Sequence, residues 1–158
     1  AGVAGFSSVG NALQKIADSG STFTSRGDDS GTHKKELSLW QAAGIDVLEH
    51  DGAWYRETGS GMGATLNVAA GMDGYTMTDR STWLKFSNKA NLKLLVEGDP
   101  MLFNQYGVIL VNPSLHSHIK ATDGQLFIDW LISEPGQLEI NQYRIEGRQA
   151  FFANAPIQ

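Results

Sequence analysis

The residues best suited to chemistry lie in the stretch TSRGDDSGTHKKE, residues 24–36. Arg26 precedes Ser30, Gly31 and Thr32, three small residues where the pattern predicts the start of a helix. The first N–H groups of a helix lack partners within it, and the helix dipole adds partial positive charge there. Small residues let an anion approach this backbone, and an arginine offers a planar fork of donors that matches an oxyanion. The pattern indicates a local anion site made of Arg26, Ser30, Gly31 and Thr32.

The same stretch also has a purely structural interpretation. Asp29 or Ser30 is then only the N-cap of the helix, and Asp28 pairs with Arg26 on the surface. A third interpretation treats Asp28 and Asp29 as a pair of catalytic carboxylates. Adjacent turn residues rarely face one another, and no nucleophile with a base accompanies them, so an enzyme has little support.

The elements that would position these residues alternate between helix and strand. A short strand is expected at 21–26, with Arg26 as its last residue, and another at 74–79. The apolar runs at 92–99 and 106–112 are the strongest strand signals and suggest burial on both faces. This alternation indicates an α/β fold. Apolar stripes predict an early helix through Val9, Leu13, Ile16 and Ala17 and a late one through Leu126, Phe127, Trp130 and Leu131.

Composition narrows the function classes further. The 158 residues suffice for one ordinary domain, and 41% of them are hydrophobic. A net charge of −5 argues against binding to nucleic acid or anionic membranes, so an anion site must be local. The absence of cysteine excludes disulfides, thiol catalysis and thiolate metal sites. No apolar run is long enough to span a membrane, and no signal peptide is visible, although a mature or cropped chain would have lost one.

Several other motifs are weaker. Thr78 and Arg80 lie at a strand-to-helix junction, where a side chain could reach a ligand cleft, although Asp79 could equally be a simple N-cap. The glycines at 59–63 lack the Lys-Ser/Thr of a nucleotide loop and favour a tight turn. His116 and His118 have no further ligands for a metal and are expected on the surface, so no metal or cofactor is predicted. His33 follows the anion turn and could support it indirectly.

Four long segments carry a resemblance to a known family. Residues 25–45, 54–70, 75–84 and 95–113 resemble the periplasmic tungstate-binding proteins of ABC uptake systems, as does the ending at 127–155. The wider class is the type II, two-lobed solute-binding protein, whose phosphate-binding members carry a comparable Arg-x-Asp-x-Ser-Gly-Thr segment. In this sequence the segment falls on Arg26, Asp28, Ser30, Gly31 and Thr32, and the resemblance implies that Arg26, Ser30, Gly31 and Thr32 contact the oxyanion, with Asp28 in a supporting position.

The resemblance also implies an organisation and a function. Residues 1–113 would form the second lobe without its first strand, and residues 114–158 would form helices that return to an N-terminal lobe missing from this chain. The expected function is extracytoplasmic, in the periplasm or its equivalent: capture of tungstate or molybdate and delivery to a membrane ABC permease, without catalysis. A phosphate or sulfate binder, an oxyanion sensor and, with less support, a hydrolase remain alternatives.

Overall fold

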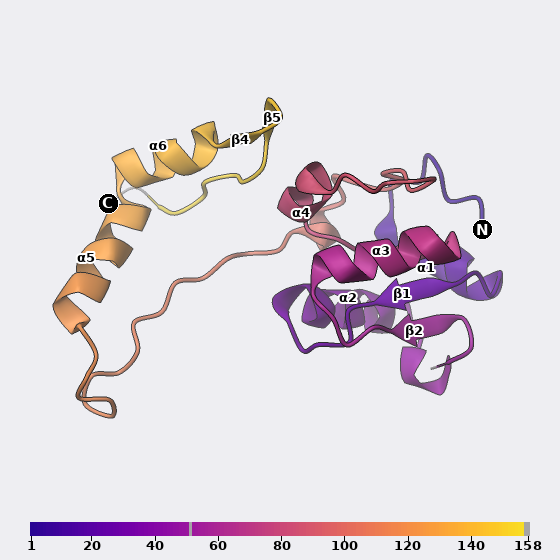
Figure 1. Cartoon of the computed structure of the whole chain (residues 1–158), viewed down its shortest axis with the longest axis horizontal. Coiled ribbons are helices and arrows are strands. Elements are labelled where there is room, and N and C mark those ends of the chain that lie inside the picture. Colours follow the sequence, from indigo (N-terminus) through magenta and orange to yellow (C-terminus); the bar gives the residue numbers. More distant parts are fainter. Residues whose placement is uncertain (51, 157–158) are drawn as a thin grey trace. The chain divides into compact units, whose positions relative to one another are not determined.

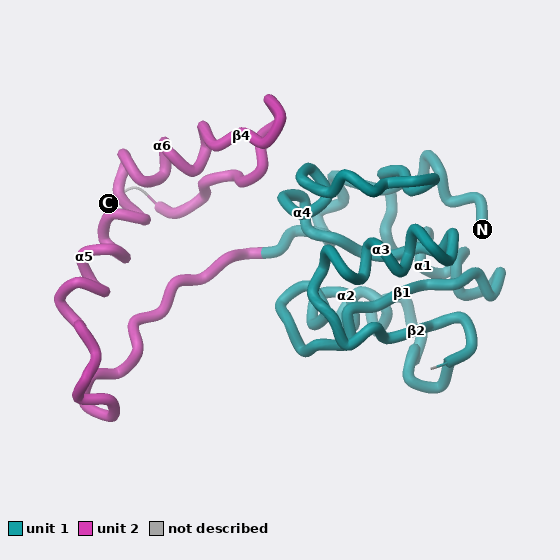
Figure 2. Tube along the Cα trace, viewed as in Figure 1, with its two compact units in different colours: residues 1–104 teal, residues 105–158 magenta. Residues whose placement is uncertain are grey.

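The computed structural model describes residues 1–50 and 52–156. It divides into two compact units, residues 1–104 and residues 105–158, which Figure 2 colours separately. The first unit ends before the apolar run at 106–112, whereas the sequence-based division at 113 places this run in the first domain. Each unit is described by itself.

The first unit is built on three parallel strands, and the fold class is α/β as predicted. The strands are β1 (Phe23–Ser25), β2 (Tyr55–Glu57) and β3 (Tyr75–Thr76), in the order β2-β1-β3. Helix α2 (Gly31–Ala42) leads from β1 to β2, and α3 (Met62–Met72) leads back across β1 to β3. Right-handed connections in opposite directions place these helices on opposite faces. Figure 1 shows α3 in front of β1, with α2 and α1 behind it.

Helix α1 (Val9–Asp18) follows the predicted apolar stripe. Its buried residues are Val9, Ala12, Leu13 and Ile16. The Ser8 side chain accepts a hydrogen bond from the N–H of Asn11 and so caps the first turn. Gly20 follows the helix with a φ of 58°, a left-handed conformation that glycine adopts readily, and this ends the helix where the sequence predicts.

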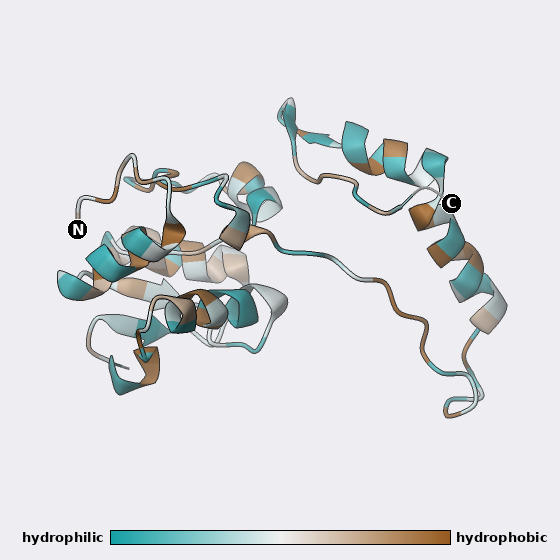
Figure 3. Ribbon diagram, turned by 180° about the vertical axis from the view of Figure 1, so that it is seen from behind, coloured by the Kyte–Doolittle hydropathy of each residue, from teal (hydrophilic) through white to brown (hydrophobic). Residues whose placement is uncertain are grey.

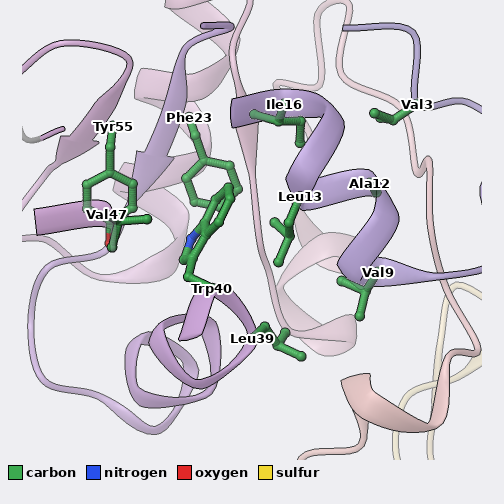
Figure 4. Close-up of a cluster of buried hydrophobic side chains, with 10 residues drawn as sticks. All are labelled: Val3, Val9, Ala12, Leu13, Ile16, Phe23, Leu39, Trp40, Val47 and Tyr55. Carbon is green, nitrogen blue, oxygen red and sulfur yellow. The ribbon is translucent and has the colours of Figure 1, made fainter. Parts of the chain in front are cut away.

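An aromatic cluster fixes β1 against α2 and β2. The Phe23 ring lies edge-on to Trp40 at 5.0 Å and stacked with Tyr55 at 6.0 Å between ring centroids. Trp40 and Tyr55 are fully buried. Figure 4 shows this cluster beside the apolar face of α1. Because aromatic packing is rigid, the carboxyl end of β1 is held in a fixed position relative to the start of α2.

Two strand predictions are wrong. Residues 92–99 and 106–112 form no strand, and Ile109 is 88% exposed. A strand needs neighbouring strands, and the described residues pair none with either run. Leu95 and Val96 nevertheless pack against the core of the first unit. The short strand β2 was not predicted, because residues 55–57 are too short to show a period. The other elements of this unit are two single turns, Val47–His50 and Pro100–Leu102, and helix α4 (Arg80–Lys85).

The second unit consists of two helices and a hairpin. Helices α5 (Ala121–Ile132) and α6 (Glu134–Gln142) are followed by β4 (Arg144–Ile145) and β5 (Arg148–Gln149), which pair antiparallel. Ser133 alone separates the two helices. Ser133 caps α6 by accepting from the N–H of Gly136, and a side chain at Gly136 would collide with the carbonyl of Trp130.

The predicted stripe of α5 lies on a helix but is not buried. Leu126, Phe127 and Trp130 are 63%, 57% and 45% exposed. Figure 3 shows hydrophobic colour along α5 and along the extended segment before it. The only buried apolar side chains described in residues 105–156 are Ile145 and Ala150. So small a core cannot stabilise a unit of this size, so these apolar side chains require a further packing surface.

Candidate functional site

Three strand-to-helix connections meet at one edge of the parallel sheet. Ser25, Glu57 and Thr76 end β1, β2 and β3, and each strand is followed by a loop and the start of a helix. Ligands of parallel sheets bind at the carboxyl ends of the strands, particularly where successive connections go to opposite faces. Here the chain changes direction at β1, so the loop after β1 occupies the favoured position.

Arg26 begins this loop and is held by Asp28. Its Nε and Nη2 donate to Oδ2 of Asp28 at 3.1 and 2.5 Å. Asp28 Oδ1 accepts the N–H of Ser30 at 3.3 Å. The bonds from Arg26, followed by those from Ser30, lower the pKa of Asp28 to about 2. The surface pairing expected under the structural interpretation is therefore present, and it holds the guanidinium at the site that the anion interpretation requires.

The start of α2 supplies backbone donors. Ser30 is the N-cap, and its Oγ accepts the N–H of His33 at 3.2 Å. Among residues 1–50 and 52–156, no hydrogen-bond partner is found for the N–H groups of Gly31 and Thr32 or for the Thr32 hydroxyl. Gly31 is exposed, and the space where its side chain would lie is open. An anion could therefore approach these donors directly.

The loop is fastened to the connection after β2. The N–H of Thr58 donates to the carbonyl of Ser25 at 3.0 Å, and that of Ser60 to the carbonyl of Arg26 at 3.1 Å. Gly27 has a φ of 59°, and a Cβ there would lie 2.6 Å from Cβ of Glu57. Only glycine satisfies both conditions, so this residue lets the loop pass closely over the end of β2.

His33 lies beneath the loop. Its side chain is buried, and Nδ1 accepts the N–H of Asp29 at 3.1 Å. Its Nε2 lies 3.4 Å from Oε1 of Glu57. The indirect supporting position that the sequence suggested for His33 agrees with this geometry.

Glu36 is a buried acid that the sequence analysis missed. Its carboxylate accepts from the Ser25 hydroxyl at 2.8 Å, the Tyr55 hydroxyl at 2.8 Å and the Trp40 indole N–H at 3.1 Å. Burial raises its pKa, although these three hydrogen bonds oppose the rise. The available signal was its spacing, three residues after His33 and four before Trp40, which places an acid on the inner face of α2.

The third connection carries Thr78 and Arg80. The Thr78 hydroxyl donates to the carbonyl of Asp79 at 3.2 Å, and Nη1 of Arg80 donates to Oε2 of Glu97 at 3.2 Å. Asp79 caps α4 through the N–H of Thr82. Burial acts to raise the pKa of Asp79, but its hydrogen bonds outweigh this and lower it. The N-cap expected at Asp79 is thus confirmed, and the cleft role of Thr78 and Arg80 stays a prediction.

The family follows from a comparison with known domains. Residues 3–135 match the PBP superfamily domain. The chain belongs to the PBP superfamily. This PBP superfamily chain is 45% identical over 146 residues to the tungstate-binding protein TupA of Peptoclostridium acidaminophilum, covering 91% of the chain and 50% of that relative. It is 43% identical over 160 residues to a putative ABC transporter anion-binding protein of Haloferax volcanii, covering 98% and 46%.

Solved structures that resemble this PBP superfamily chain include two tungstate-related proteins. The tungstate-binding protein TupA from Desulfovibrio alaskensis matches with a TM-score of 0.79 and 45% identity, over 98% of this chain and 63% of that one. The tungstate ABC transporter structure from Geobacter sulfurreducens matches with a TM-score of 0.80 and 41% identity, over 90% and 59%. The resemblance inferred from the sequence is confirmed. The chain spans about half the length of the curated relatives it matches.

The structure also shows where the glycine-rich stretch at 59–63 and the two late histidines lie. Gly61 is the N-cap residue of α3 and provides no side-chain capping bond. Within the first turns of the helix, the hydroxyl of the buried Thr65 forms a hydrogen bond with the Thr58 hydroxyl at 2.8 Å. His116 and His118 are exposed as predicted. Within the described residues no three His, Asp or Glu side chains gather as metal ligands, and none of the helices is long and apolar enough to cross a membrane.

Proposed function

We propose that this chain forms the oxyanion-binding part of an extracytoplasmic ABC solute-binding protein, with tungstate as the foremost ligand and molybdate as the next. The observation that carries the proposal is the link through Asp28 from the Arg26 guanidinium to Ser30, the N-cap of α2. Within the described residues, the N–H groups of Gly31 and Thr32, which follow Ser30, have no hydrogen-bond partner. Relatives named for tungstate and anion binding support it. The protein then binds and releases its ligand without changing it.

The donor set suits a fully deprotonated oxyanion. Tungstate, molybdate and sulfate offer only acceptors at neutral pH, whereas phosphate keeps a proton that needs an acceptor. Asp28 is the nearest carboxylate, and it already accepts from Arg26 and from Ser30. Its lowered pKa shows that these donors stabilise the charged form. With both oxygens already accepting hydrogen bonds from the protein, Asp28 serves to hold the donors in place.

A second lobe completes the proposed binding protein. The relatives are about twice as long as this chain, and the second unit exposes an apolar helix face that needs a packing surface. We infer that the face of Leu126, Phe127 and Trp130 packs on an N-terminal lobe of the same protein. Closure of the two lobes would surround the anion, because a hydrated dianion binds well only when nearly every oxygen finds a new partner. An ABC permease in the membrane would then receive the ligand, with the binding protein in the periplasm or its equivalent.

Titration with four anions tests the ligand. The chain and its full-length form are titrated with tungstate, molybdate, sulfate and phosphate by calorimetry, while amide NMR spectra of the chain report which residues respond. We expect the tightest binding for tungstate, with the amide signals of Gly31 and Thr32 shifting most. Tighter binding of phosphate would favour a phosphate-binding protein, responses confined to other residues would place the site elsewhere, and turnover of an ester substrate would favour a hydrolase.

A further inference from the structure

The loop between β1 and α2 bends at two residues on either side of Asp28. Gly27 and Asp29 have φ values of 59° and 58°, both in the left-handed region. Glycine adopts this region freely, whereas an aspartate does so at a cost that local hydrogen bonds offset. The sharp bend at Asp29 therefore needs a cause within the fold.

Side chains beneath the loop receive the N–H groups of both residues. The N–H of Gly27 donates to the Ser25 hydroxyl at 3.3 Å, and Ser25 itself donates to the buried Glu36. The N–H of Asp29 donates to Nδ1 of His33 at 3.1 Å. These inward bonds leave the N–H groups of Gly31 and Thr32, just after Asp29, without protein partners within the described residues. The direction of the donors thus depends on the bend.

The bond from Asp29 also determines the tautomer of His33. A ring nitrogen that accepts a hydrogen bond carries no proton, so the neutral ring carries its proton on Nε2. Within the part of the chain that the structure describes, this buried atom has no hydrogen-bond partner, and Oε1 of Glu57 lies 3.4 Å away. The carboxylate of Glu57 faces the N–H end of the ring and favours this tautomer. The side chain of His33 is only 11% exposed, so the surrounding packing fixes its orientation.

We propose that His33 is a positioning residue of the oxyanion site: it fixes Asp29 in its left-handed conformation and so aims the N–H groups at the start of α2. This inference rests on the proposed function. The anion touches Gly31 and Thr32, while His33 acts on it only through the loop. Without the acceptor on His33, Asp29 can leave its left-handed conformation, and the N–H groups of Gly31 and Thr32 then change direction. Binding weakens as a result, because donors must be held closely in place to bind well.

Two substitutions of His33 separate this role from general packing. In His33→Leu the acceptor is lost at similar volume, and in His33→Asn the amide oxygen stands where Nδ1 was. We expect tungstate affinity to fall about tenfold in His33→Leu, the effect of one lost hydrogen bond, and to recover largely in His33→Asn. The matched control is His116→Leu, an exposed histidine of the second unit, with no change expected. Equal affinity of a folded His33→Leu and the wild type would overturn the proposal, as would failure of His33→Asn to exceed His33→Leu.

A measurement without ligand keeps the inference separate from the proposed function. Long-range ¹H–¹⁵N NMR of the histidine rings reports the tautomer directly, and hydrogen exchange reports the protection of the Asp29 amide. We expect the Nε2–H tautomer and a protected Asp29 amide. This result would support the positioning of Asp29 by His33 even if no oxyanion binds and the proposed function fails. If His33→Leu does not fold, the wild-type spectrum and His33→Asn still decide. An Nδ1–H tautomer or an unprotected Asp29 amide would overturn the proposal.

Discussion

Replacement of Arg26 by alanine should weaken tungstate binding at least about 100-fold in the full-length protein. A hydrogen bond between charged groups contributes about 1.5–3 kcal/mol, and the guanidinium can give two. Arg26 is already bonded to Asp28 through two nitrogens, so part of its interaction with an anion replaces an existing one. We therefore take the lower value for each bond, which gives about 3 kcal/mol and a factor of more than 100.

The loss of Arg26 has a second consequence. Asp28 then stands unpaired beside the site, and its negative charge repels the incoming anion. The double variant Arg26→Ala/Asp28→Ala should consequently bind better than Arg26→Ala alone. Arg26→Lys should recover only part of the loss, because an ammonium group cannot reproduce the planar fork.

Calorimetry at fixed ionic strength measures these effects. The control is Arg56→Ala, which removes the same charge from an exposed position on β2 and separates direct contact from net charge. Circular dichroism checks that each variant is folded. Wild-type affinity in a folded Arg26→Ala protein would refute the reasoning and place the site elsewhere, and an equal loss in Arg56→Ala would show that only net charge matters.

Three further predictions concern the ligand preference, the acid stability and the apolar face. Asp28→Asn should leave the preference for tungstate over phosphate nearly unchanged, and a selective loss of phosphate binding in calorimetry would contradict this. Asp99 accepts the N–H groups of Val9 and Met101, which lowers its pKa; the stabilisation is complete above the ordinary value of 3.8 and is lost as the pH falls below it. In thermal melts, Asp99→Asn should therefore lower the melting temperature at pH 7 and reduce the loss on acidification, and parallel curves for both proteins would exclude the linkage. If a second lobe completes the site as proposed, the isolated chain should self-associate and bind tungstate at least about 100-fold more weakly than the two-lobed protein, because that lobe would supply further donors and close a water-free cleft. Trp130→Glu should reduce the association in sedimentation velocity, and a wild-type monomer with full affinity would contradict both statements.

Features with a local cause could be predicted from the sequence. Helix α1 was predicted because Val9, Leu13 and Ile16 repeat at helical spacing and Gly20 ends them. The start of α2 was predicted because Ser30 is a good N-cap and its effect is confined to one turn. The strand expected at 21–26 is present as β1, although it ends at Ser25, one residue before Arg26. Each of these signals lies within a few residues of the feature it determines.

Features that depend on distant neighbours were missed or wrong. The runs at 92–99 and 106–112 have strand-like composition. Their β-propensity reflects how such residues pack against neighbouring strands, and the described residues place no strand beside either run. The role of Glu36, on helix α2, depends on Tyr55, which reaches it from strand β2. His33 was assigned a supporting role without its partner, since Glu57 lies 24 residues later in the sequence.

An anion site in an acidic chain requires donors that act only at short range. The net charge of −5 repels a dianion at a distance, and salt screens this repulsion over about 10 Å. Attraction must come from one guanidinium and the N–H dipoles at a helix start, whose effect fades within a helical turn. At long range the negative charge of Asp28 cancels the positive charge of Arg26. At short range the guanidinium N–H groups of Arg26 remain beside the loop, where an anion would meet them. Selectivity then depends on the direction of each donor more than on total charge, and this explains why so much of the buried structure serves to hold one five-residue loop.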